Sequence, residues 1–413
     1  MVTIDAKMAW RNIWRNPRRT VLTISAIAFA SLLLIFMLSF QFGSYEALIN
    51  SSVKIHAGHL KVQAKGYQNK RDMHLVVPDP SAAGKILDNL QGIDAYTFRA
   101  NAFSLISSKE RTYGIAVTGI DPAREANVST LAKLIRQGSY LFEKDTNKAL
   151  LGQLLAKNLQ AGLGDELIIL GQGRDGSIAA TVVQVKGIYS SGIDEFDRNT
   201  IHIPLKTFQD VYSMHNAVHE VVVVCKSLRD VYTVKKNIQE VINNQSSKSS
   251  ITVLDWQELM PGLLQGIQMD LISGIIFYVI LILVVAFSIL NTFLMAIFER
   301  TREFGILMAI GTTPGRLTKI VLLESMSMTM LGIIAGIIMG SIITFYFQVN
   351  GIDIYGSSEI LSQFGISGRI HPRLSILSVF SGPFAVFLIT FLAALYPALK
   401  IRGLRPVEAI TYV

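Results

Sequence analysis

The sequence has 413 residues, of which half are hydrophobic and only 16% are charged, whereas soluble proteins carry about 25% charged residues. Together with a mean hydropathy of +0.41, this excludes a wholly soluble chain. The single cysteine, Cys225, excludes an intrachain disulfide. We expect Cys225 to be buried and His215 and His219 to be a surface pair. No metal site is expected.

Four runs without Asp, Glu, Lys or Arg are each longer than the roughly 20 residues that cross a bilayer as a helix. The runs are Val21–Phe42, Leu271–Phe298, Ser325–Phe347 and Leu374–Leu399. The first is too long for the core of a signal peptide, and no cleavage site follows it, so it is expected to stay as an anchor. The sequence therefore predicts an α-helical membrane protein with four transmembrane helices.

The predicted organisation places a large external domain between the first and second spans. In chain order we expect an interfacial amphipathic helix at 1–20, the first span at 21–42, the external domain with its stalk helices at 43–270, the second span at 271–298, an inner loop at 299–319, the third span at 320–347, an external loop at 348–373, the fourth span at 374–399 and an inner tail at 400–413.

The charges are divided unevenly among these segments. Residues 43–270 contain 24 Lys and Arg against 23 Asp and Glu, so nearly all of the net charge of +8 lies elsewhere. It is concentrated before the first span, between the second and third spans, and after the fourth. Because positive residues favour the cytoplasmic side, both termini and the 299–319 loop are expected in the cytoplasm. The excess of basic residues is thus a topology signal, and no nucleic-acid partner is expected.

Residues 5–19 have the pattern of a helix that lies on anionic headgroups. Ala6, Ala9, Trp10, Ile13 and Trp14 share one side, and the basic residues share the other. The Asn16-Pro17 pair is expected to break this helix before the first span. An ordinary positively charged anchor is the alternative.

The external domain is expected to mix α-helices and β-strands. Val- and Ile-rich runs predict strands, and longer periodic runs predict helices. The predicted strands are 166–170, 179–189 and 218–225; the predicted helices are 149–163, 228–243 and a stalk over 255–270 that leads into the second span.

The third span contains Gly332, Gly336 and Gly340, a repeat of small residues that lets two helices approach closely. The sequence leaves open whether the partner helix belongs to this chain or to a second subunit. No phosphate-binding loop, nucleophile elbow or zinc-protease motif occurs. Glu324 is the only ionisable residue within the spans, which argues against an ion-coupled transporter or a channel.

The loop after the second span carries a motif with clustered charges and glycines. It reads Glu299-Arg300-Thr301-Arg302-Glu303-Phe304-Gly305-Ile306-Leu307-Met308-Ala309-Ile310-Gly311. This resembles the signature of the MacB/FtsX-like ABC transporter permeases, and Tyr396-Pro397-Ala398 with Pro406-Val407-Glu408-Ala409-Ile410 is similar to the family's C-terminal motif. By length, the chain is nearest to the lipoprotein-releasing LolC/LolE permeases, and residues 185–197 resemble a LolE-type stretch.

The resemblance implies a permease that is not itself an enzyme and binds no cofactor, with ATP and Mg bound by a separate cytoplasmic ABC ATPase dimer. It implies mechanotransmission in a bacterial inner membrane, with lipoproteins released from the outer leaflet. Other implied partners are a second permease subunit, identical or different, membrane lipids, and a periplasmic lipoprotein carrier or adaptor. A MacB-like efflux permease and an FtsX-like regulator of an envelope hydrolase are the alternatives. The residues expected to couple to the ATPase are Glu299, Arg300, Thr301, Arg302, Glu303, Gly305, Ile306, Ala309 and Gly311.

The outer ends of the first two spans carry large apolar side chains at the height where acyl chains leave the bilayer. Packing between the stalks would explain them equally well. As a hypothesis, they form a surface that binds the acyl chains of a cargo. The residues are Phe36, Leu38, Phe40 and Phe42 on the first span and Leu263, Leu264 and Ile267 before the second.

Overall fold

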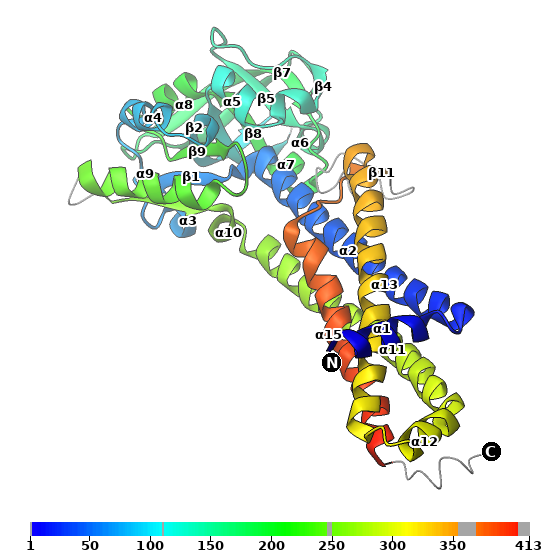
Figure 1. Cartoon of the computed structure of the whole chain (residues 1–413). Helices are drawn as coiled ribbons and strands as arrows, with labels where there is room; N and C mark the ends of the chain where they lie inside the picture. Colours follow the sequence, from blue (N-terminus) through cyan, green and yellow to red (C-terminus); the bar gives the residue numbers. More distant parts are fainter. Residues whose placement is uncertain (1, 110, 246–249, 354–368, 404–413) are drawn as a thin grey trace. The chain divides into compact units, whose positions relative to one another are not determined.

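The computed structural model describes residues 2–109, 111–245, 250–353 and 369–403 (Figure 1). The chain forms two compact units. We call residues 2–45, 266–353 and 369–403 the helical unit, and the described residues within 46–265 the sheet unit. The unit boundaries fall inside two long helices, after Tyr45 and before Gly266.

Four helices are long and apolar enough to cross a membrane, which confirms the four predicted spans. They are α2 (Pro17–Ser52), α11 (Pro261–Glu299), α13 (Pro314–Asn350) and α15 (Ile376–Lys400). At a rise of about 1.5 Å per residue, α2 and α11 are each over about 50 Å long, well beyond the hydrocarbon thickness of about 30 Å. Both therefore extend past their apolar runs. The stalk expected over 255–270 is a continuous helix only from Pro261, because Asp255 ends a strand and Trp256–Leu259 form a separate short helix.

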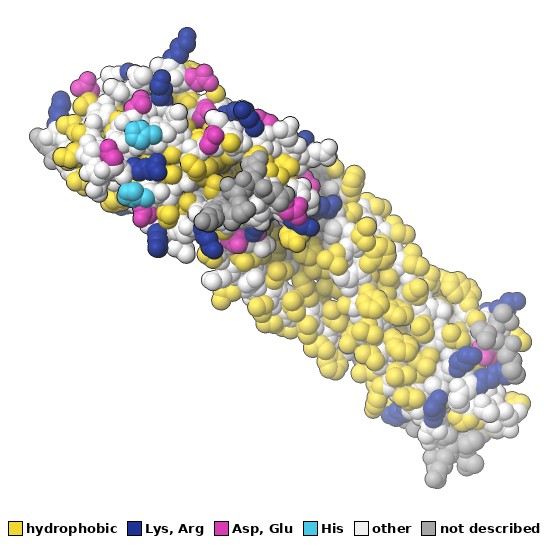
Figure 2. Space-filling model, turned by 90° about the vertical axis from the view of Figure 1, so that its left-hand side faces the viewer, with side chains coloured by type: hydrophobic (Ala, Val, Ile, Leu, Met, Phe, Trp, Pro, Cys, Tyr) yellow, Lys and Arg dark blue, Asp and Glu magenta, His cyan; other side chains and the backbone are white. Residues whose placement is uncertain are grey.

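Short elements complete the helical unit. These are α1 (Val2–Ile13), α12 (Thr301–Ala309), β11 (Ile352–Asp353), β12 (Arg369–Ile370) and the 3-10 helix η3 (Ile401–Gly403). Figure 2 shows hydrophobic side chains along the sides of this unit and Lys and Arg side chains gathered at one end.

The helix expected over residues 5–19 is shorter in the structure. It ends at Ile13, and a turn precedes Pro17, the first residue of α2. Proline suits the first helical position because its missing N–H would have no partner there. Ala9 and Ile13 of α1 are buried, whereas Trp10 and Trp14 are exposed. Of the apolar side predicted from the sequence, one part therefore packs against the protein and the other part is left uncovered.

The sheet unit contains one ten-stranded mixed sheet in the order β10-β1-β9-β2-β3-β8-β5-β7-β4, with β6 paired to β2 and β7. The strands are β1 (Leu60–Ala64), β2 (Ile93–Ser107), β3 (Thr112–Ile120), β4 (Ile135–Gly138), β5 (Lys148–Gly152), β6 (Glu166–Gln172), β7 (Ile178–Tyr189), β8 (Thr200–Pro204), β9 (Glu220–Cys225) and β10 (Ile251–Asp255). The helices are α3 (Tyr67–Lys70), α4 (Pro80–Asp88), α5 (Pro122–Val128), α6 (Gln153–Leu159), α7 (Asp194–Asn199), α8 (Leu205–Val211), α9 (Val231–Gln245) and α10 (Trp256–Leu259), with the π-helix η1 (Val53–Ala57) and the 3-10 helix η2 (Leu131–Leu134).

The strands predicted at 166–170, 179–189 and 218–225 are confirmed as β6, β7 and β9, and the helix at 228–243 as α9. The helix predicted over 149–163 is wrong at its start, because residues 148–152 form β5 and only 153–159 are helical. Leu150 and Leu151 lie in the sheet between β7 and β8 and are fully buried. A short apolar run of this kind does not distinguish a buried strand from a helix.

Cys225 is buried, as expected, and burial raises the pKa of its thiol to about 12. The prediction of a surface His215–His219 pair is wrong for His219, which is fully buried directly before β9. The His219 ring stacks on Tyr67, and its Nδ1 accepts a hydrogen bond from the Asn101 backbone N at 2.9 Å. In the described ranges, no group of three or more His, Cys, Asp or Glu could hold a metal ion.

Candidate functional site

The chain between the second and third spans folds into a short helix between two turns. α11 ends at Glu299, Arg300 is the N-cap residue of α12, and α13 begins at Pro314. Residues 314–319, expected in the loop, thus belong to the third long helix. Gly311 has φ of +103°, a conformation that side chains disfavour. This glycine lets the chain leave α12 and turn into α13 within a few residues.

α12 has a buried face and an exposed face. Thr301, Phe304, Gly305 and Met308 are buried at helical spacing. Phe304 and Met308 pack in a cluster with residues of α11, α13, α15 and η3. On the other side, Arg302, Ile306, Ala309 and Ile310 are exposed, Ile310 at 78%. The helix is therefore fixed to the spans through one side and presents an apolar surface with one cation on the other.

The predicted coupling residues consequently occupy three environments. Thr301 and Gly305 are buried supports; Arg302, Ile306, Ala309 and Gly311 are exposed; and Glu299, Arg300 and Glu303 form ion pairs within the chain.

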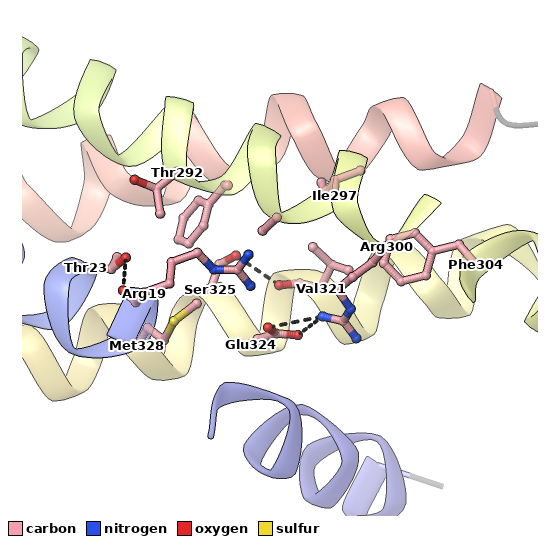
Figure 3. Close-up of a pocket in the computed structure, with 12 residues that line it drawn as sticks. Arg19, Thr23, Thr292, Ile297, Arg300, Phe304, Val321, Glu324, Ser325 and Met328 are labelled. Atoms are coloured by element: carbon pink, nitrogen blue, oxygen red, sulfur yellow. Dashed lines mark hydrogen bonds and ion pairs between the residues drawn. The ribbon is translucent and has the colours of Figure 1, made fainter. Parts of the chain in front are cut away.

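Arg300 is held against α13 by Glu324 (Figure 3). Its Nη1 lies 3.0 Å from Oε2 and 3.3 Å from Oε1 of Glu324, and its guanidinium lies 5.3 Å from the centre of the Phe304 ring. Glu324 is only 6% exposed. The one ionisable residue that the sequence placed within the spans is therefore a partner for the residue that begins α12.

Three further ion pairs connect the N-terminal segment with this loop. Arg19 Nη1 lies 2.8 Å from Glu299 Oε2, Arg316 Nε lies 3.0 Å from Asp5 Oδ1, and Arg15 pairs with Glu303. The hydrogen bond from Arg15 lowers the pKa of the Glu303 carboxyl. Sequence reasoning missed these pairs, because partners separated by about 300 residues leave no local pattern.

A small cavity lies among these residues, between α2, α11, α12 and α13 (Figure 3). Its volume of about 20 Å³ has room for roughly one water molecule. The cavity therefore cannot accommodate a nucleotide or a cargo.

The three glycines of α13 all face α2. A Cβ at Gly332 would lie 2.7 Å from Ile27 Cβ, one at Gly336 would lie 2.6 Å from the Ala28 carbonyl oxygen, and one at Gly340 would lie 3.1 Å from Leu32 Cα. Of the two partners that the sequence left open, the structure shows a helix of the same chain.

The proposed cargo residues are mostly half-buried and partly packed against other spans. Phe36 stacks on Phe40, with ring centres 6.4 Å apart, and contacts Phe347 of α13 edge-on at 5.8 Å. Leu38 and Phe42 are half-buried, and Ile267 is buried. Leu263 and Leu264, also half-buried, belong to the sheet unit.

A polar cluster that the sequence did not reveal joins α2 to α11. Asp270 Oδ2 accepts hydrogen bonds from the Tyr45 hydroxyl at 2.6 Å and from Gln41 Nε2 at 3.1 Å. Tyr278 donates to Gln41 Oε1 at 2.8 Å. A Cβ at Gly274 would lie 2.7 Å from the Gln41 amide nitrogen, so the two helices approach closely here.

Comparison with known proteins gives two matches to family models. The FtsX-like permease C-terminal model matches residues 275–406, and the MacB-like periplasmic core domain model matches residues 20–241, more than half of the chain. The chain belongs to the MacB/FtsX-like permease family. This confirms the resemblance stated from the sequence, and the permease has the expected ABC permease architecture of four spans and a mixed α/β domain.

Curated relatives resemble the permease over most of its length. It is 21% identical over 408 residues to the lipoprotein-releasing system transmembrane protein LolC of Neisseria meningitidis serogroup B, covering 95% of the permease and 94% of that protein. It is 23% identical to the macrolide export ATP-binding/permease protein MacB of Campylobacter jejuni, covering 98% of the permease but 61% of that protein. A crystal structure of the periplasmic region of MacB from Actinobacillus actinomycetemcomitans aligns with a TM-score of 0.38 and 15% identity, over 48% of the permease and 87% of that structure.

Proposed function

We propose that this permease is the membrane subunit of an ABC transporter that releases lipoproteins from the outer leaflet of a bacterial inner membrane. The LolC relative supports this cargo, because the two proteins match over nearly their whole lengths. Its MacB relative, whose name includes an ATP-binding part, extends well beyond the match. MacB-like efflux and FtsX-like regulation of an envelope hydrolase are the competing functions.

The observation that carries the mechanism is the two-sided structure of α12. Its buried face is continuous with the packing of α11, α13 and α15, whereas its exposed face has no partner among the described residues. A soluble ATPase that dimerises on ATP and Mg would press on this exposed face and move the spans without itself entering the membrane. In this function the permease supplies no catalytic residue, and the energy comes from the partner.

The docking surface can be tested with substitutions that leave the internal ion pairs intact. Arg302→Glu combined with Ile306→Asp places two carboxylates on the exposed side of α12, and we expect loss of co-purification with the ATPase. Charge reversal at Glu303 is less suitable, because Glu303 binds Arg15 and Arg300. The matched control is Lys319→Glu, an exposed charge on α13. Normal assembly of the Arg302/Ile306 variant would show that α12 is not the dock.

We further propose that both termini and α12 lie in the cytoplasm and the sheet unit lies outside, as the positive-inside rule indicates. A cysteine at exposed Lys157 should react with an impermeant thiol reagent in intact spheroplasts, and one at Thr313 only after lysis. Ser247, the external site suggested by the sequence, lies outside the described residues. Native Cys225 should stay unlabelled, because its thiol is buried and its pKa is about 12. The reverse labelling pattern would refute this topology.

A further inference from the structure

The N-terminal segment and the loop between the second and third spans are joined at three separate points. Asp5, Arg15 and Arg19 pair with Arg316, Glu303 and Glu299, respectively. Their partners lie on three helices: Arg316 near the start of α13, Glu303 on α12 and Glu299 at the end of α11. Single exposed ion pairs contribute little, but three pairs spread over the loop fix its position relative to the N-terminal segment, from Asp5 on α1 to Arg19 on α2.

α1 uses only one side for packing against the protein. Asp5, Ala9 and Ile13, four residues apart, are buried. Trp10, on the remaining surface, and Trp14, in the turn directly after α1, are about half exposed, and their rings meet edge-on with centres 6.4 Å apart. Tryptophan is enriched at the level of lipid headgroups because its ring is apolar and its N–H is polar. A pair of such rings indicates a helix that lies at a membrane surface.

Three cations on or next to this helix have no acidic partner in the part of the chain that the structure describes. These residues, Lys7, Arg11 and Arg18, are all exposed. Asp5, the only acid in α1, is already paired with Arg316. The exposed surface thus combines aromatic rings with three free positive charges, which complements the phosphates of anionic lipids. Val21 and Leu22, near the start of α2, are exposed apolar residues as well.

We propose that anionic phospholipid headgroups bind Lys7, Arg11 and Arg18, and that the N-terminal segment transmits this binding to the coupling loop through the ion pairs of Asp5, Arg15 and Arg19. The lipid fixes α1 in the headgroup layer, and the pair of Arg15 with Glu303 fixes α12 at a defined depth below the spans. Lipid charge thereby sets the position of the surface on which the ATPase docks. Only the effect on ATPase docking rests on the proposed function. The binding of lipid and its effect on the position of α12 do not.

Lipid binding is tested with the intrinsic fluorescence of Trp10 and Trp14 in the full-length permease, with Trp256→Phe as background. The protein is placed in phosphatidylcholine nanodiscs that contain equal small fractions of either brominated phosphatidylglycerol or brominated phosphatidylcholine. We expect stronger quenching by the anionic lipid, and a loss of preference of about five-fold for each cation replaced in Lys7→Gln, Arg11→Gln and Arg18→Gln. Equal quenching by both lipids in the parent protein would overturn the proposal.

Transmission to the loop is tested with an environment-sensitive fluorophore on Ala309→Cys, an exposed position of α12. Addition of phosphatidylglycerol to phosphatidylcholine nanodiscs should shift its emission. Arg15→Gln with Arg19→Gln should abolish the shift but keep the quenching of Trp10 and Trp14. Lys319→Gln, which removes an exposed charge without a described partner, should keep both responses.

A charge exchange guards against misfolding of the double variant. In the background of Arg15→Gln, the exchange of Arg19→Glu with Glu299→Arg retains one ion pair of opposite direction and should restore part of the emission shift. If the Arg15/Arg19 variant responds to phosphatidylglycerol like the parent, α1 does not act on the loop through these pairs. Because neither measurement requires the ATPase, failure of the docking test would leave both results interpretable.

Discussion

At the scale of single residues, the sheet unit contains buried charged and titratable side chains whose pKa values differ strongly from those in water. Burial alone would raise the pKa of Glu125, but the adjacent Arg99 guanidinium lowers it below its usual range, at an Nη2–Oε1 distance of 2.6 Å. Lys61 and Glu220 form a second buried pair at 2.9 Å. Burial lowers the pKa of His59 and His219 to about 4 and that of His202 to about 3. The domain is therefore built around neutral histidines.

These histidines predict a loss of stability in mild acid. The unfolded chain takes up protons near pH 6.5, whereas the folded imidazoles remain neutral to about pH 4, so stability should fall as the pH drops through this window. The expected loss at pH 5 is about 1–2 kcal/mol per histidine. Two of the rings accept backbone hydrogen bonds at Nδ1, from Cys225 N and Asn101 N, which protonation would break.

Hydrogen exchange of β9 in the full-length permease at pH 7.5 and 5, corrected for intrinsic rates, measures this loss. His74→Gln serves as the control, because His74 is exposed. This variant should show the same difference in β9 protection between the two pH values as the parent protein. Equal protection of β9 at both pH values would contradict the prediction.

Gly336 allows a second prediction at this scale. Gly336→Ile would bring a side chain against the Ala28 carbonyl and Ser31, 2.6 Å from each at the Cβ, and should cost at least about 1–3 kcal/mol. Gly266→Ile is the matched control, since a Cβ there meets nothing within 4 Å. Thermal unfolding in detergent should separate the two variants, and equal melting temperatures would show that α2 and α13 can move apart at little cost.

At the scale of elements, periodicity and composition located the spans well but could not identify their partners. The apolar run Val21–Phe42 predicted α2, yet the contact of α2 with Gly332, Gly336 and Gly340 depends on packing between segments far apart in the sequence. The sequence predicted a helix in place of β5. Leu150 and Leu151 are buried between β7 and β8, and no local sequence pattern indicates that these two strands flank them. The motif around Arg300 was recognisable, whereas its support by Glu324, Arg15 and Arg19 required the folded chain.

At the scale of the whole molecule, α11 differs from the other spans in how little of it the chain itself covers. Only 6% of the most apolar stretch of α11 is buried within the protein, compared with 39% for that of the first candidate span, which contains α2. Its uncovered surface is apolar and includes Ile272, Ile276 and Phe277. In the proposed transporter, lipid, a second permease subunit or the acyl chains of a cargo would cover this surface.

Photo-crosslinkers at Phe40 and Leu264 test whether the outer ends of these helices bind cargo. If they do, adducts with a lipoprotein should form without ATP and disappear when ATP is added to the complex with its ATPase. A crosslinker at Ile334, exposed on α13, controls for general contact with lipids and should give no lipoprotein adduct. Adducts confined to the permease itself would assign Phe40 and Leu264 to packing between the stalks.

The length of α11 also has a mechanical consequence. A continuous helix of 39 residues is a rod of nearly 60 Å, and it ends at Glu299, which Arg19 holds beside the loop. If such a rod pivots by about 5° at that end, its far end sweeps roughly 5 Å, close to one helical turn. In the proposed transporter, a small tilt at α12 would thus be magnified along a single unbroken helix.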